Sequence, residues 1–433
     1  MDPATVGYIG LAILFILLFS GMPIGLVMAV IGVVGMVIVT RWEGGIAILG
    51  NSPYLTWSSY DLSVTPLFIL MGSICFHAGI SQDLYRSFHN WLGHMPGGLA
   101  MATVGACAGF SAVSGSSLAT VATMGMVSLP EMERYKYSPA LACGSVAAGG
   151  SMGILIPPSI VLIIYGMLTE QSIGKLFLAG FIPGVLEAVS YMIVIYVMCR
   201  FNPLMGPRGP LTTLRAKFAS LKDTWVVLAL FMLVIGGIYL GIFTPTEAGG
   251  IGAFGALLFA LLTNKLTWKT FGASLLETTK TSAMIFVLLL GAVILNYFMA
   301  VTRLPFELTE FISGLPVNRY VIIMFIIITY ILLGCVISSM ALILLTVPIF
   351  FPVIVGLGFD PIWFGIIAVR VMEVGQITPP VGINVFIVKG IAKDIPMGTI
   401  FRGIIPFFMA DILGIALLVA VPQLATFLPS LIR

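Results

Sequence analysis

The chain has 433 residues; 59% of them are apolar and only 9% carry a charge, with 20 Lys and Arg against 17 Asp and Glu. A soluble domain has roughly 25% charged residues, which it needs to cover its water-exposed surface. The composition therefore excludes a soluble enzyme, a disordered chain and a fibrous protein, and it predicts an all-α protein that crosses a lipid bilayer several times. The net charge of +3 comes without a basic cluster, which excludes a nucleic-acid partner, and the five single cysteines favour no metal centre.

Windows of about 20 apolar residues predict the membrane-spanning segments. If both termini lie on the outer side of the membrane, most Lys and Arg residues between these segments fall on the inner side, as membrane proteins prefer. We therefore expect both termini outside. In chain order, the predicted segments cover residues 4–19, 22–40, 62–80, 139–168, 176–199, 225–243, 246–263, 281–301, 361–388 and 404–428.

Two further apolar stretches, at 97–129 and 318–351, are too long for one simple span and are interrupted by Gly and Ser. The first has Ser114-Gly115-Ser116-Ser117 at its centre, and the second has Ile337-Ser338-Ser339. A glycine permits a sharp turn, and a helix interrupted there directs free N–H groups at an anion and free carbonyls at a cation. We expect both stretches to be re-entrant hairpins, which enter the membrane and return on the same side.

Paired prolines interrupt two of the predicted spans, Pro157-Pro158 within 139–168 and Pro379-Pro380 within 361–388. Because proline donates no N–H, the helical carbonyls before it lose their partners. Unpartnered carbonyls at membrane depth are tolerated only where they face protein or a polar cavity. The prolines therefore predict two broken helices whose free oxygen atoms suit Na⁺.

The two halves of the chain resemble each other at an offset of 222 residues. The matches fall on Pro, Gly and Ser, which fix backbone shape, and include Ser116 with Ser338 and Gly153 with Gly375. An odd number of predicted crossings separates equivalent points, so the second repeat should be inverted, as in secondary transporters. We divide the chain into a first repeat at 1–202, an inner-side linker at 203–222 and a second, inverted repeat at 223–433.

Five charged residues, Glu187, Glu247, Arg370, Glu373 and Asp411, lie within or at the edges of predicted spans. A charge there costs roughly 2.5–3.5 kcal/mol on insertion scales, so each should face a partner or a cavity. Arg370 and Glu373 are three residues apart and share a helix face, which favours an internal ion pair. The alternative is that Arg370 attracts an anionic substrate.

Four motifs together resemble one transporter family. They are the stretch 95–120, GILIPPS at 153–159, TPTEA at 244–248 and EVGQITPPVGIN at 373–384. With these motifs in the same order over essentially the whole chain, the protein resembles the large membrane subunit (DctM type) of tripartite ATP-independent periplasmic (TRAP) transporters.

The resemblance implies Na⁺-coupled import of a small organic acid anion, such as a dicarboxylate, sialic acid or a similar carboxylate, across the bacterial inner membrane. It implies neither an enzyme nor a cofactor, and Na⁺ serves only as the coupling ion. It also implies two partners, a small four-helix membrane subunit and a periplasmic substrate-binding protein. Transport would follow an elevator mechanism, in which the hairpins and broken helices slide as a block past a fixed scaffold. Both termini would then be periplasmic.

The resemblance further implies two Na⁺ sites, one in each half, with the substrate between the hairpin tips. Arg370 is added as a substrate candidate on the charge argument above. The first Na⁺ site would comprise Ser114, Gly115, Ser116, Ser117, Gly150, Gly153 and Ile156, and the second Ile337, Ser338, Ser339, Gly375, Thr378, Gly382 and Asn384. The substrate would contact Ser116, Ser117, Pro158, Ser159, Ser338, Ser339 and Pro380.

Two other functions are weighed against this one. The buried Glu187 and Glu373 are consistent with a proton-coupled organic anion carrier. Ser114-Gly115 together with a histidine would suit an intramembrane serine hydrolase, which needs its nucleophile and base within about 2.6–3.2 Å. The hydrolase has no need for the second serine pair at 338–339, so the repeat argues against it.

Overall fold

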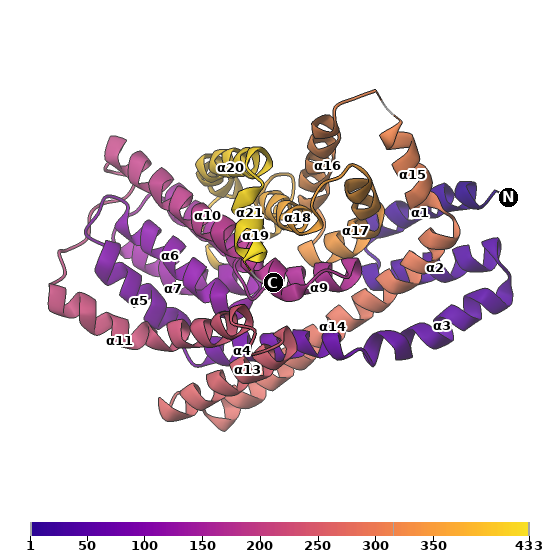
Figure 1. The fold of residues 1–433 in the computed structure, drawn as a ribbon. Coiled ribbons are helices and arrows are strands. Elements are labelled where there is room, and N and C mark those ends of the chain that lie inside the picture. The colour runs from indigo at the N-terminus through magenta and orange to yellow at the C-terminus, as the bar shows by residue number, and fades with distance from the viewer. Residues whose placement is uncertain (1, 315, 432–433) are drawn as a thin grey trace.

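The protein, described here from a computed structural model, consists of helices joined by turns and short unwound segments (Figure 1). The structure describes residues 2–314 and 316–431. The first half comprises α1 (Pro3–Phe19), α2 (Ile24–Val39), α3 (Trp42–Trp57), η1 (Tyr60–Ser63), α4 (Val64–His77), α5 (Ile80–Leu92), α6 (Gly98–Ser114), α7 (Ser117–Arg134), α8 (Pro139–Ser151), η2 (Met152–Ile154), α9 (Ile160–Thr169) and α10 (Ile173–Phe201).

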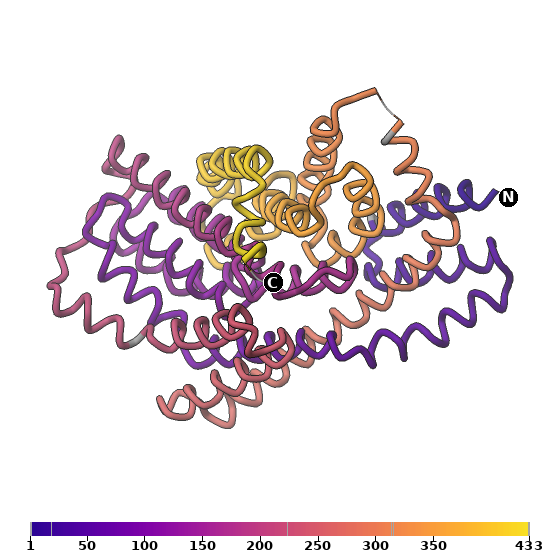
Figure 2. The backbone as a smooth tube through the Cα atoms, in the orientation of Figure 1, coloured from indigo at the N-terminus to yellow at the C-terminus, as the bar shows by residue number. Residues whose placement is uncertain are grey.

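The second half continues through twelve further elements (Figure 2). They are α11 (Leu214–Phe231), η3 (Met232–Gly236), α12 (Gly237–Tyr239), α13 (Pro245–Leu262), α14 (Trp268–Val301), α15 (Leu304–Ser313), α16 (Arg319–Gly334), α17 (Ser339–Gly356), α18 (Pro361–Ile377), α19 (Ile383–Ile391), α20 (Met397–Ala420) and α21 (Gln423–Ser430).

Six helices of the described chain are at least 18 residues long and apolar enough to cross a membrane. Several other apolar helices are shorter, among them α6 with 17 residues and α16 with 16. At 1.5 Å per residue these two reach only about 25 Å, less than the roughly 30 Å of a hydrocarbon core. The six longer segments are Tyr60–His77, α10, α13, α14, α17 and α20.

The predicted fold class is confirmed: the protein is all-α, and each half contains one helical hairpin and one broken helix. The stretch 97–129 forms the α6–α7 pair, and 318–351 forms the α16–α17 pair. The stretch 139–168 contains α8, η2 and α9, with an unwound segment before Ile160, and 361–388 contains α18 and most of α19. Each interruption coincides with the Gly, Ser or Pro residues that predicted it.

Several predicted boundaries differ from the structure. The span predicted at 281–301 is the second part of α14, which is 34 residues long and starts at Trp268 behind a Thr267 N-cap. The span predicted at 404–428 ends early, because α20 stops at Ala420 and Pro422 separates it from α21. The linker predicted at 203–222 contains the first turns of α11.

The two halves interlock around the hairpins. In Figure 1, α1, α2 and α3 lie at one end of the molecule, α5 and α11 lie at the other, and α9, α17 and α18 lie between them. Each hairpin packs on the broken helix of its own half and also on that of the other half, through the pairs α7–α19 and α17–α9. This arrangement brings the two hairpin tips and the two breaks into the middle of the molecule.

Candidate functional site

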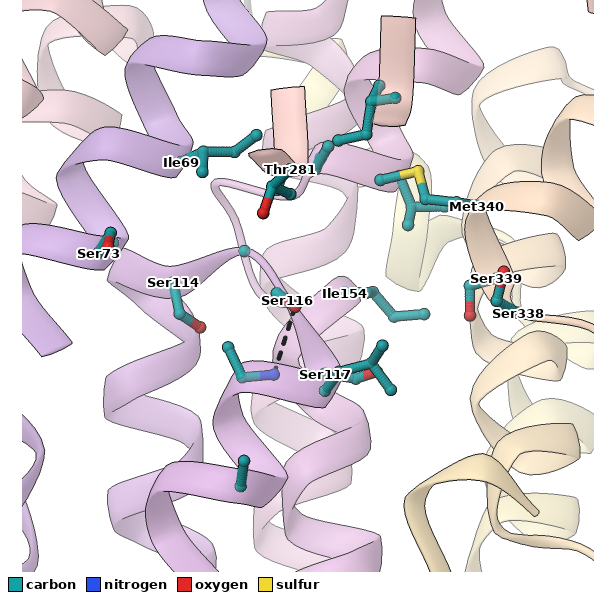
Figure 3. A pocket seen from close by; sticks show the side chains of 18 of the residues that line it. Ile69, Ser73, Ser114, Ser116, Ser117, Ile154, Thr281, Ser338, Ser339 and Met340 are labelled. Carbon is teal, nitrogen blue, oxygen red and sulfur yellow. Dashed lines mark hydrogen bonds between the residues drawn. The ribbon is translucent and has the colours of Figure 1, made fainter. Parts of the chain in front are cut away.

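A cavity of about 470 Å³ lies between the two hairpin tips, within the size range of small-molecule sites. Figure 3 shows Ser116 and Ser117 of the first tip on one side and Ser338 and Ser339 of the second tip on another. Gln376 of the second broken helix also lines the cavity. The two halves therefore both contribute to one site.

The first tip is built around a glycine in the left-handed conformation. Gly115 has φ +60°, and a methyl group there would lie 2.7 Å from the backbone oxygen of Pro158. Only glycine therefore allows both the turn and the close contact with the break. The Ser116 hydroxyl then caps α7 by accepting a hydrogen bond from the Ala119 N–H at 3.4 Å (Figure 3).

The second tip presents a second helix N-terminus to the cavity. Ser338 is the N-cap of α17, but its side chain forms no cap hydrogen bond. The hydroxyl of Ser339 is buried and has no hydrogen-bond partner among the described residues. Helix N-termini attract anions through their free N–H groups and their dipole. With α7 and α17 both starting at the cavity wall, this region suits a carboxylate.

Each break lies against the hairpin of its own half. A methyl group at Gly153 would lie 2.5 Å from the backbone oxygen of Ser116. At the equivalent position of the second half, a methyl group at Gly375 would lie 2.7 Å from the backbone of Gly334. The close approach in both copies supports the repeat and brings main-chain oxygen atoms of hairpin and break together.

Hydrogen bonds connect the two halves at the second broken helix. The Ser117 hydroxyl donates to Gln376 Oε1 at 2.7 Å, which joins the first hairpin to the second broken helix. Asn384 Nδ2 donates to the backbone oxygen of Ala147 at 3.5 Å. The side-chain oxygen of Asn384, Oδ1, is buried without a partner among the described residues. Such an oxygen suits a cation as ligand.

The structure brings some of the predicted residues together at the cavity and places others outside it. Ser159 is fully buried, donates to the Ile154 carbonyl and caps α9, and Pro380 is exposed. The predicted residues that line the cavity are Ser114, Gly115, Ser116, Ser117, Ser338 and Ser339. Those outside its lining are Gly150, Gly153, Ile156, Pro158, Ser159, Ile337, Arg370, Gly375, Thr378, Pro380, Gly382 and Asn384.

Arg370 belongs to a separate, closed group that we call the charge cluster: Glu187, Tyr191, Arg370, Glu373 and Asp411. The guanidinium forms ion pairs with Glu187, with Glu373 at 3.2 Å and with Asp411 at 2.7 Å. The Tyr191 hydroxyl donates to Asp411 at 2.6 Å. All these side chains are almost completely buried. The structure thus contains the predicted Arg370–Glu373 ion pair and adds partners from α10 and α20.

The sequence reasoning missed the acidic wall of the cavity. Glu277 of α14 lines it, and its carboxylate accepts a hydrogen bond from the Ser73 hydroxyl of α4 at 2.6 Å. His77 Nε2 lies 3.3 Å from the same oxygen. The available signal was a lone carboxylate at a predicted span edge, but its partners lie about 200 positions away in the sequence.

Comparison with known proteins gives a family. Residues 11–424 match the model of the DctM component of tripartite ATP-independent periplasmic transporters. A C4-dicarboxylate TRAP transporter large permease of Pseudomonas aeruginosa is 35% identical over 87% of each chain. The sialic acid TRAP transporter large permease of Vibrio cholerae is 33% identical over 96% of each chain.

Two other similarities add detail. The isethionate TRAP transporter permease DctMQ of Oleidesulfovibrio alaskensis is 31% identical, over all of this chain and 66% of that protein. The solved structure of the Alcanivorax borkumensis YdaH transporter aligns with a TM-score of 0.62 at 15% identity, over 87% of this chain and 88% of that one, which supports the fold. With its helical repeats and apolar spans, the chain belongs to the DctM family of TRAP transporter large permeases, which are multi-pass inner-membrane transport proteins and not enzymes.

Proposed function

We propose that this permease carries a small organic acid anion, a dicarboxylate, sialic acid or a similar carboxylate, into the bacterial cytoplasm together with Na⁺. One observation carries the proposal: both hairpin tips meet at one cavity, where the N-termini of α7 and α17 are exposed to a ligand. A carboxylate there gains favourable interactions with the free N–H groups. The named substrates of the relatives, C4-dicarboxylates and sialic acid, support the substrate class.

Na⁺ would bind where hairpin and break meet in each half. Na⁺ needs several oxygen ligands, and unwound helices supply main-chain carbonyls for it. In the first half, Gly153 brings its break against the Ser116 carbonyl. In the second half, Ser339 and Asn384 have buried side-chain oxygens without partners among the described residues. These are the two regions assigned to Na⁺ by the family resemblance.

Alternating access would follow an elevator movement of the hairpins and broken helices. These elements pack on one another and also on α5, α10 and α20, whereas α2 and α3 pack on α14 at the periphery. We assign the first group to the moving block and α1–α3 and α14 to the scaffold, with both termini on the periplasmic side.

A small permease subunit and a periplasmic binding protein complete the transporter, as the family implies. The DctMQ relative is consistent with a closely associated small subunit, because this chain accounts for 66% of its length. In our proposal the binding protein delivers the substrate to the cavity and performs much of the selection.

Uptake into proteoliposomes containing the permease, its small subunit and its binding protein tests the proposal. We expect a labelled organic acid, chosen from a series that includes succinate and N-acetylneuraminate, to accumulate under an inward Na⁺ gradient and not under a pH gradient alone. Accumulation driven by the pH gradient, with no effect of Na⁺, would establish the proton-coupled alternative instead. The proton-coupled alternative was based on Glu187 and Glu373. Neither residue lines the cavity, which favours coupling to Na⁺.

A further inference from the structure

The cavity is electrically asymmetric. The N-termini of α7 and α17, with Ser116 and Ser339, supply partial positive charge. The wall formed by α4 and α14 carries Glu277, the one ionisable side chain among the described residues that line the cavity. Apolar residues such as Ile69, Phe110 and Met284 form much of the remaining surface.

The Glu277 side chain lines the cavity and is oriented by contacts from α4. One carboxylate oxygen accepts from Ser73 at 2.6 Å and lies 3.3 Å from His77 Nε2, so the side chain is oriented from α4. Its side chain remains 47% exposed, which leaves the carboxylate accessible from the cavity. Thr281, one helical turn further along α14, lies on the same wall and faces the first hairpin tip in Figure 3.

A ligand with negative charge at every end would meet Glu277 unfavourably, because like charges repel across a partly desolvated space. A hydroxyl or ammonium group would instead donate a hydrogen bond to the carboxylate. The N-termini of α7 and α17, which start at the cavity, supply free N–H groups for the carboxylate of such a ligand.

We propose that Glu277 is a specificity-determining residue that selects organic acids carrying a hydrogen-bond donor, a hydroxyl or an ammonium group, remote from their carboxylate. The inference rests on the proposed function, because it assigns the ligand carboxylate to the hairpin tips. It narrows the substrate class from any small organic anion to hydroxy acids and amino acids.

Four probes of equal chain length test this proposal: 4-aminobutyrate, 4-hydroxybutyrate, butyrate and succinate. Their dissociation constants would be measured by calorimetry on the full chain with its small subunit in lipid nanodiscs, at saturating Na⁺. We expect both donor-bearing probes to bind about tenfold or more tightly than succinate, the gain of one charge-assisted hydrogen bond. Glu277→Gln should reduce that preference to a few-fold or less.

Two further variants separate a specific role from a general disturbance. Glu277→Lys should reverse the order of affinities, so that succinate binds more tightly than 4-aminobutyrate. Glu133→Gln removes an exposed carboxylate of α7 outside the cavity lining and should leave the order unchanged. Each variant would be checked for normal elution and thermal unfolding before titration.

The possible outcomes distinguish the two proposals. The role of Glu277 would be overturned if Glu277→Gln kept the wild-type order of probe affinities, or if succinate were the tightest ligand of the wild type. Neither result would contradict Na⁺-coupled transport. If binding of the probes to Glu277→Gln no longer depended on Na⁺, Glu277 would be an ion ligand, and its proposed role in substrate selection would also be overturned. If no probe binds and no labelled acid enters proteoliposomes under a Na⁺ gradient, the proposed function itself fails.

Discussion

Two polar regions lie among the apolar helices of this permease, and they are built in opposite ways. The charge cluster around Arg370 joins three carboxylates to one guanidinium by internal ion pairs and lies outside the cavity lining. The cavity between the tips instead uses hydroxyls, helix N-termini and one half-exposed carboxylate, Glu277. In the first region the charged groups pair with one another, although oxygens of Glu187, Glu373 and Asp411 have no hydrogen bond among the described residues. In the second region hydroxyls, helix N-termini and a carboxylate face the cavity.

The comparison shows that the most extensively paired buried charge, Arg370, lies outside the cavity to which we assign the substrate. The sequence favoured an internal ion pair for Arg370 and left attraction of an anion as the alternative; in the structure its contacts on α10, α18 and α20 join the two halves. Helix N-termini suit a carboxylate ligand better than Arg370 does, because their free N–H groups have no ion pairs that must first be broken. The cluster should therefore control stability, and the cavity should control transport.

The largest effect on stability is expected when the charge cluster loses its cation. Arg370→Met leaves three buried carboxylates without their cation, which should lower the free energy of unfolding by about 3–5 kcal/mol. Thermal unfolding of the purified protein would measure the change, with Arg370→Lys expected to lose less. Normal stability combined with lost substrate affinity would show that Arg370 acts on the substrate after all.

The next effect concerns the contact between break and tip. Gly153→Ala places a methyl group 2.5 Å from the Ser116 oxygen, so the two segments must separate. We expect a stability loss of about 1–3 kcal/mol from overpacking and a loss of Na⁺-driven uptake larger than this stability loss explains. Gly398→Ala is the matched control, because a methyl group there meets nothing within 4 Å. Equal effects of the two changes would argue against a special contact at Gly153.

A smaller effect on folding, but a clear one on transport, is expected at the second tip. Ser339→Ala removes a buried hydroxyl with no partner among the described residues, so stability should change little. Na⁺-driven uptake should fall about tenfold, with a higher Na⁺ concentration needed for half-maximal rate. Ser128→Ala, which removes a hydroxyl bonded to the Met124 carbonyl of α7, serves as control. Unchanged Na⁺ dependence in Ser339→Ala would remove this hydroxyl from the ion site.

The smallest effect is expected at the surface pair of Lys265 and Asp83. The lysine is 40% exposed and Asp83 14%, so Lys265→Met should change stability by about 1 kcal/mol, well below the effect of Arg370→Met, and leave uptake unchanged. Thermal unfolding at low and high salt would detect the pair. A loss comparable to that of Arg370→Met would contradict the distinction between paired surface charges and the closed cluster.

Local residue chemistry made the hairpins and breaks predictable. Gly115 and the two proline pairs act on their own backbone, so their effect is visible without knowledge of the fold. The tip serines followed from the same local argument, and the structure places six predicted residues at the cavity.

Tertiary partners were not predictable in the same way. Glu187 and Asp411 were recognised as buried charges, but their common partner depends on how α10 and α20 pack on α18. Glu277 becomes a cavity residue only because α14 packs on α4. Helix ends also lie beyond the apolar window, as in the 34-residue α14, whose start is set by the Thr267 N-cap and not by hydropathy.

The hydrogen bond from Ser117 to Gln376 has a practical consequence. It joins the first hairpin to the second broken helix at 2.7 Å, so any change in spacing between these segments must break it. A pair of spectroscopic labels introduced nearby would therefore report, in real time, whether this hairpin and this broken helix move as one body or separate when substrate is exchanged.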